Sequence, residues 1–137
     1  MILDSLKSLL ISDPAFETLA STRAYDTMFP RGTPMLPAVV YHVAAKHTDY
    51  TFAGPSNLND ITVQFDVYAE KAPEVRALHD AVVKILSGYV GELQDGGYIN
   101  GAFLVTEGDK PYVPAVNKTA IGFLIMLQVR VVYGDVA

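Results

Sequence analysis

The sequence contains no cysteine among its 137 residues. This excludes disulfide bridges, catalysis by a thiolate, and zinc or iron–sulfur sites built on cysteine. Long hydrophobic runs are lacking too, since the longest run spans residues 120–127 and stops before Gln128, whereas a membrane-spanning helix needs about 20 residues. Asp4 precedes the first lysine and no small-residue cleavage site follows, which argues against a signal peptide. We therefore expect a protein that stays in the cytoplasm and does not contact a membrane.

Positive charge is also scarce. Ten Lys and Arg stand against fifteen Asp and Glu, giving a net charge of −5, and no basic stretch is present. A protein whose affinity comes from neutralising phosphates needs such a stretch, so nucleic acid is not expected as a specific ligand. Only 18% of the residues are charged, against about 25% in a typical soluble domain.

Apolar residues are plentiful by contrast. They make up 50% of the chain, and the mean hydropathy is +0.24. Without a membrane segment, this excess predicts that some apolar surface is buried against other subunits. The length corresponds to one domain, at roughly 100–200 residues per domain, so residues 1–137 are expected to form a single domain with its own core.

Three stretches have helical patterns. Leucines recur at helical spacing over residues 2–10. Asp13-Pro14 ends that helix and begins a further helical turn, with Asp13 as its cap. The principal helix begins near Ala72, where Pro73 suits the first turn, and ends near Gly88. Its apolar stripe consists of Val75, Leu78, Val82, Ile85 and Tyr89.

Strands are predicted on both sides of a long hairpin arm. Arg23–Phe29 is a short extended segment before a loop at residues 30–34, and residues 38–45 are β-branched and aromatic. The arm, Lys46–Asp60, is expected to turn at residues 54–57. In the return strand, residues 61–68, apolar side chains alternate with polar ones, which predicts one core face and one polar face.

The C-terminal third contains loops and one long strand. Residues 91–101 are glycine-rich with a turn at 95–97, residues 102–107 form a strand, and a proline-containing loop follows. In the last strand, Ile121–Tyr133, the odd-numbered residues form one apolar face, and Leu124 and Met126 make the first half apolar on the other face as well. That second face needs a cover, and either a neighbouring subunit or the N-terminal helix could supply it.

These elements predict an α+β fold. We expect a mainly antiparallel sheet of about four to five strands, with the N-terminal helix and one main helix packed on one face.

No active site is visible in the sequence. His42 and His47 are expected on opposite faces of one strand, which disfavours a shared metal, and His79 beside Asp80 is interpreted as a solvated surface residue. Asp60 and Asp66 are interpreted as solubilising carboxylates. Neither a phosphate-binding glycine loop nor a Gly-x-Ser-x-Gly elbow occurs. We therefore predict no catalytic, cofactor-binding or metal-binding residues, and no cofactor.

The succession of segments resembles the tail-completion, or tail-terminator, family of tailed phages. The N-terminal helix before Asp13-Pro14-Ala15 and Leu36–Tyr41 carry the first part of the resemblance, and Gly54-Pro55-Ser56 follows in the arm. The later part consists of Val63–Ala69, Glu74–Leu78 and Asp80–Val82. Residues 91–118 fit less well.

The resemblance implies a structural protein of the virion, at the head–tail junction, that is assembled in the host cytoplasm. Such a protein forms a homo-oligomeric ring, commonly a hexamer, which caps the tail tube, stops its polymerisation and offers the surface on which the head docks. The implied partners are the major tail tube protein and a head-closure or connector protein. No enzymatic activity is implied.

Four residues are predicted to lie at subunit or tube contacts: Tyr50 and Phe52 in the arm, and Leu124 and Met126 in the last strand. Two alternatives remain open at this point. One is a different head–tail connector or a minor tail protein. The other is a small-molecule-binding α+β domain, with a pocket between the main helix and the sheet near His42 and Tyr68.

Overall fold

The computed structural model describes residues 2–26, 37–47, 50–51, 54–55, 58–92, 98–112 and 122–134. The helices found there are α1 (Ile2–Ile11), α2 (Pro14–Ala20) and α3 (Ala72–Leu86). The strands are β1 (Ala24–Asp26), β2 (Ala38–His47), β3 (Tyr50–Thr51), β4 (Gly54–Pro55), β5 (Leu58–Ala69), β6 (Gly91–Glu92), β7 (Tyr98–Tyr112) and β8 (Gly122–Gly134). The predicted loop at 30–34 and turn at 95–97 lie outside the described residues.

The main sheet has six strands in the order β1-β2-β5-β8-β7-β6. The α+β class is therefore confirmed, but the expectation of four to five strands is too low. The sheet is also mixed, because β1 pairs with β2 in parallel, while every other neighbouring pair is antiparallel. The short edge strands β1 and β6 account for the difference, since segments of two or three residues carry no alternation for a sequence pattern to reveal.

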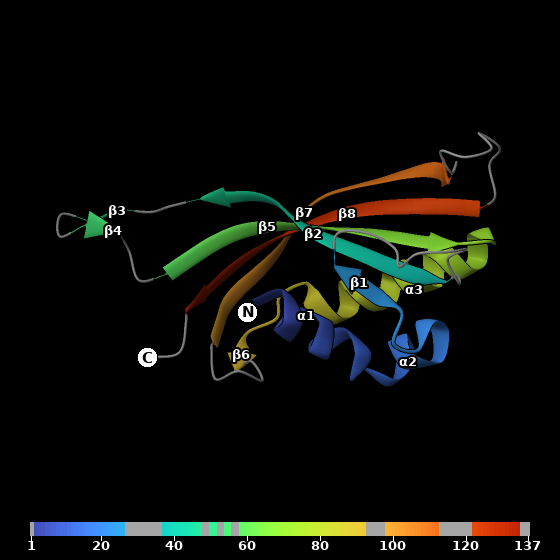
Figure 1. The fold of residues 1–137 in the computed structure, drawn as a ribbon, viewed down its shortest axis with the longest axis horizontal. Helices are drawn as coiled ribbons and strands as arrows, with labels where there is room; N and C mark the ends of the chain where they lie inside the picture. The colour runs from blue at the N-terminus through green and yellow to red at the C-terminus, as the bar shows by residue number, and fades with distance from the viewer. Residues whose placement is uncertain are drawn as a thin grey trace.

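All three helices lie on one side of the curled sheet, as Figure 1 shows. The odd-numbered side chains of β5 from 61 to 69 and of β8 from 125 to 131 point to that side and join one buried cluster with residues of α1, α2 and α3. Phe65, Leu78 and Val82 are fully buried in it. The predicted core face of the return strand, and the helical stripe that packs on it, are confirmed.

The helix boundaries follow from local chemistry. The Asp13 side chain accepts hydrogen bonds from the backbone N–H groups of Ala15, at 2.9 Å, and Phe16, at 3.3 Å, so it caps α2 as expected. Pro73 stands in the first turn of α3. At the other end Gly88 adopts a φ of +77°, a left-handed conformation that glycine takes without strain. Its N–H donates to the Ala102 carbonyl of β7 at 2.8 Å, which ties the end of α3 to the sheet.

Strand β7 is much longer than the predicted strand at 102–107. It runs from Tyr98 to Tyr112, so parts of the predicted glycine-rich and proline-containing loops belong to the sheet. Its pairing with β8 shifts register twice, between Ile99 and Gly101 and between Leu104 and Thr106. Each bulge adds one residue and reverses the alternation that follows, so no single period marks the strand in the sequence.

The hairpin arm is present, but its tip differs from the expectation. Residues 54–55, predicted to begin the turn, form strand β4 and pair with β3, Tyr50 opposite Pro55 and Thr51 opposite Gly54. Glycine and proline are common in turns, but both are also compatible with a two-residue edge strand. Figure 1 shows this small hairpin at one end of the molecule, away from the helices.

Replacing Phe65 tests the core. Phe65→Ala should lower the free energy of unfolding by about 3–5 kcal/mol, because the ring is fully buried and leaves a cavity. Urea denaturation measures the loss. Phe123→Ala is the matched control, since that ring is 45% exposed, and it should cost clearly less. Equal losses at both positions would contradict the burial of Phe65 in the core.

Tyr41 provides a test of burial by pH. Its side chain packs against Phe65, with ring centroids 6.2 Å apart. Burial, assisted by the negative charges of Asp26 and Asp4, raises the pKa of Tyr41 from 10.0 to about 12. The folded state thus holds this proton more tightly than the unfolded state. The resulting stability is complete below pH 10 and is lost as the pH rises from 10 towards about 12.

Tyr41→Phe should therefore flatten the fall in unfolding free energy over this range, measured by denaturation at several pH values. Tyr98→Phe, at a position 43% exposed, should leave the fall in place. An unchanged pH dependence in Tyr41→Phe would show that this phenol is not the group responsible.

Candidate assembly surfaces

The sheet face opposite the helices, here called the open face, carries the even-numbered residues of β5 and β8. Leu124 and Met126 lie on it, directly opposite Tyr68 and Asp66 of β5, and neither belongs to the helix-packed core cluster. The N-terminal helix therefore does not cover them, which removes one of the two covers considered above. Leu124 is 9% exposed in the single chain, so it has little surface left to bury, while Met126 is half-buried.

The middle of the open face is polar. Gln128 donates through Nε2 to Oε1 of Gln64 at 3.1 Å, and Gln64 donates through its own Nε2 to Oδ1 of Asp66 at 3.0 Å. The ladder exists because Gln64 and Gln128 pair directly across β5 and β8. This ladder fixes the orientation of the Asp66 carboxylate. Asp66 therefore has a structural role in addition to the solubilising role expected from the sequence.

Asp60 is the second carboxylate that sequence reasoning misjudged. It is 3% exposed, and the Arg130 guanidinium of β8 donates to it through Nε, at 3.0 Å to Oδ1 and 3.1 Å to Oδ2, and through an Nη. A buried carboxylate needs such a partner. The two residues are 70 positions apart in the chain, so no short-range pattern could have shown the pair.

Strand β7 carries more exposed large hydrophobic residues than any other element in the described part of the chain. Seven large hydrophobic residues are exposed there, and four of them belong to β7: Tyr98, Phe103, Leu104 and Val105. The Phe103 ring lies over Gly101, where an added Cβ would come within 2.7 Å of it. A run of three exposed apolar residues next to an edge is typical of an interface and is normally avoided elsewhere.

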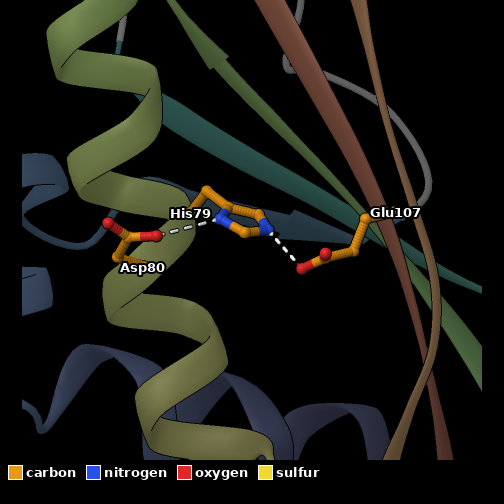
Figure 2. A network of polar contacts seen from close by, with 3 residues as sticks. All are labelled: His79, Asp80 and Glu107. Carbon is orange, nitrogen blue, oxygen red and sulfur yellow. Dashed lines mark hydrogen bonds and ion pairs between the residues drawn. The ribbon is translucent and has the colours of Figure 1, made fainter.

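His79 lies between α3 and β7, as Figure 2 shows. Its Nε2 is 2.8 Å from Oε1 of Glu107, its Nδ1 is 3.2 Å from Oδ1 of Asp80, and its side chain is 16% exposed. The expectation of a solvated surface residue is therefore wrong. The misjudgement has the same origin as the shortened β7, because the bulge after Leu104 turns Glu107 towards the helix. No nucleophilic side chain is among the partners found for this imidazole, and the arrangement joins the helix to the sheet.

The histidines of β2 also differ from the expectation. A bulge between Val43 and Ala45 places His42 opposite Gln64 and position 47 opposite Asp60, and these two partners share the open face. The prediction of opposite faces assumed unbroken alternation, and this bulge interrupts it. No cluster of three or more metal-ligating residues that could hold an ion is found within the described ranges.

The alternative pocket between the main helix and the sheet is not formed by the residues proposed for it. His42 pairs with Gln64, and Tyr68 with Leu124, so both lie on the open face and not under α3. Tyr50 lies in β3 of the arm, whereas Phe52 falls outside the described residues. Their predicted role in contacts stays a prediction.

Comparison with protein families decides the identity. The model of the family "Tail completion protein gp17" matches residues 4–110. The chain belongs to the tail completion protein gp17 family. The resemblance noted in the sequence is thus confirmed, and the match includes part of the region after residue 91 that fitted it less well.

Solved structures agree with this tail completion fold. One chain of a structure described as the virion of a native gene transfer agent (GTA) particle superposes with a TM-score of 0.73 at 18% sequence identity, covering 96% of this chain and 93% of that chain. Among curated proteins, none matches the sequence significantly. No helix in the described ranges is long and apolar enough to cross a membrane. The family match makes this tail completion protein a structural component of a phage-like tail.

The Asp60–Arg130 pair can be tested by a double-mutant cycle. Arg130→Ala should lower the free energy of unfolding by about 1–3 kcal/mol, because a buried carboxylate loses charged hydrogen-bond donors. Asp60→Asn in the same chain should recover part of that loss. Arg76→Ala on the exposed side of α3 serves as the control and should change stability by less than about 0.5 kcal/mol. Purely additive losses would mean that the pair is not coupled.

Proposed function

We propose that this protein forms a ring that caps the finished tail tube, stops its polymerisation and presents the surface on which the head docks. The family match over residues 4–110 carries the proposal. The fold it shares with a chain of a virion structure agrees with a role in such a particle. The partners are further copies of the chain, the major tail tube protein and a head-closure or connector protein. The ring resides in the virion after assembly in the host cytoplasm.

The chemistry of the surface supports a role in assembly. Exposed apolar side chains gather on β7, and the mean hydropathy of the chain is positive, both typical of a subunit that buries surface against others. The net charge of −5 suits a ring through which DNA passes, because an acidic wall does not bind phosphate. Neither a catalytic group nor a cofactor has a part in this function.

The open face supplies one of the ring contacts in this proposal. Met126 offers the larger gain on association, because it retains more accessible surface than Leu124. Tyr50 and Phe52 of the arm supply a second contact, to the neighbouring subunit or to the tube. Tyrosine and phenylalanine give large contact areas at low entropic cost, which suits such a role.

Deleting the gene from the particle that encodes it tests the capping function. Without the protein, tails should be longer and more variable in length and should fail to join heads, and supplying the wild-type protein in trans should restore both properties. Electron microscopy of lysates measures tail length and head attachment. Tails of normal length that still carry heads would show that the protein does not end tails.

Met126→Lys tests the contact on the open face. The new ammonium lies opposite Asp66, which offsets its charge within the subunit, whereas burying it in a contact between subunits costs several kcal/mol. We expect a folded protein, checked by circular dichroism, with at least tenfold fewer capped tubes. Leu124→Asp is a poorer probe, because Leu124 is buried within the subunit.

Ala77→Lys on the exposed side of α3 is the control. It adds the same charge on the helical side and should leave capping unchanged. Normal capping by Met126→Lys would remove the open face from the ring contact.

A further inference from the structure

Strand β7 has an outer edge that the described residues leave open. On that side β6 pairs with Tyr98 and Ile99, and the Gly88 N–H donates a hydrogen bond to the Ala102 carbonyl. Beyond that point no backbone partner for this edge is present among the described residues. Five consecutive side chains, residues 103–107, are exposed there. Natural proteins protect open edges with charges or proline. In β7 such residues occur only from Glu107 onwards, and the apolar Phe103-Leu104-Val105 stands at the edge before them.

The opposite side of the sheet has a second open edge. Strand β1 covers β2 only at Val39, Val40 and Tyr41. From His42 to His47 the outer side of β2 has no strand partner in the described part of the chain, and Val43 is 39% exposed. The molecule therefore presents an open edge at each side of one sheet.

The two edges are matched in their apolar residues. Val43, Val63, Val129 and Leu104 face one another across four neighbouring strands, all on the helical side of the sheet. The inner two are 0% and 1% exposed, but the outer two, Val43 and Leu104, are 39% and 37% exposed. The two central residues of this apolar row are therefore buried, whereas the two end residues are exposed. Joining two copies at these ends would bury Val43 of one copy and Leu104 of the other.

Strand direction also permits the junction. Three successive antiparallel pairings separate β2 from β7, so the two strands run in opposite directions. When copies related by rotation follow one another around a ring, the β7 edge of one meets the β2 edge of the next in antiparallel fashion, which is the more stable pairing. Because the two surfaces differ, the contact is heterologous, and such contacts form a ring when the rotation between copies closes.

From these observations we infer that the open edge of β7, residues 103–112, pairs antiparallel with the open edge of β2, residues 42–47, in the next copy of this chain. The inference deepens the proposed function, on which it rests for the closed ring, by naming the strands that join its subunits. Closing a sheet requires neighbouring strands to be staggered. When β2 of one copy is displaced towards the C-terminal end of β7 of the other, Lys46 lies opposite Leu104 and nearer to Glu107.

Cysteine cross-linking tests the pairing directly, because the natural sequence has no cysteine. Two double variants are used. Val43→Cys with Leu104→Cys tests the unstaggered register, in which only residues 42–44 and 103–105 can pair, and Lys46→Cys with Leu104→Cys tests the staggered one, in which residues 42–47 pair with 103–108. Within one chain, β2 and β7 are separated by three strand spacings, about 14 Å. A disulfide needs Cα atoms about 4.4–6.8 Å apart, so any bond must join two copies.

At concentrations where light scattering detects oligomers, mild oxidation of at least one double variant should give a ladder of linked species on a non-reducing gel. Mixing the corresponding single variants should stop at dimers. Each single variant alone should stay monomeric on the gel. Ala77→Cys with Thr18→Cys, at exposed helical positions, is the control pair and should give no ladder.

Each other outcome overturns a defined part of the account. Oligomers without links in either double variant overturn the strand pairing and leave the ring intact. Dimers formed by Leu104→Cys alone show an isologous contact between two β7 edges, and this overturns the heterologous junction. A protein that stays monomeric even with tail tubes overturns both the pairing and the ring. A linked ladder from a protein that does not cap tubes supports the pairing and overturns the proposed function.

Discussion

The register between β5 and β8 is the constraint on which the rest of the structure depends. Twelve residue pairs run without a shift from Leu58 opposite Gly134 to Ala69 opposite Phe123. Because side chains alternate along a strand, this pairing places every odd-numbered residue of both strands on the helical face and every even-numbered one on the open face. A slip of one residue in a single strand would bury Asp66 and expose Phe65. The two central strands therefore decide which surface is core and which is left for contacts.

The parts of the fold that follow one unbroken period were predictable. The alternation of residues 61–68 gave β5 and its core face, and the helical stripe gave α3 with its boundaries within two residues. Asp13 marked the start of α2 because its cap depends on neighbouring residues only. These elements are determined by local patterns, and local patterns are what a single sequence displays.

The misjudged features have long-range or irregular causes. Bulges in β2 and β7 reverse the alternation, so His42 and His47 were placed on opposite faces and β7 was cut short. Asp60 and His79 were misjudged because their partners, Arg130 and Glu107, are 70 and 28 positions away. For the candidate site, the sequence predicted that Leu124 and Met126 need a second cover, either from a neighbouring subunit or from the N-terminal helix. It did not reveal the exposed edge of β7, which depends on the order of the strands.

The same division of faces connects the fold to the proposed role. The helices complete the core on one side, so the open face and the two sheet edges are left to meet other molecules. A ring that caps a tube needs contacts of this kind between subunits and a further surface for the tube, and the arm that carries β3 and β4 extends from the end of the molecule away from the helices (Figure 1).

The most direct test is to image tail tubes mixed with the purified protein carrying a gold label, by electron microscopy. The account predicts one label-bearing ring at a single end of each tube and none along its length, with no further growth when tube subunits are added. Label distributed along the tubes, or tubes that continue to grow at the labelled end, would contradict it.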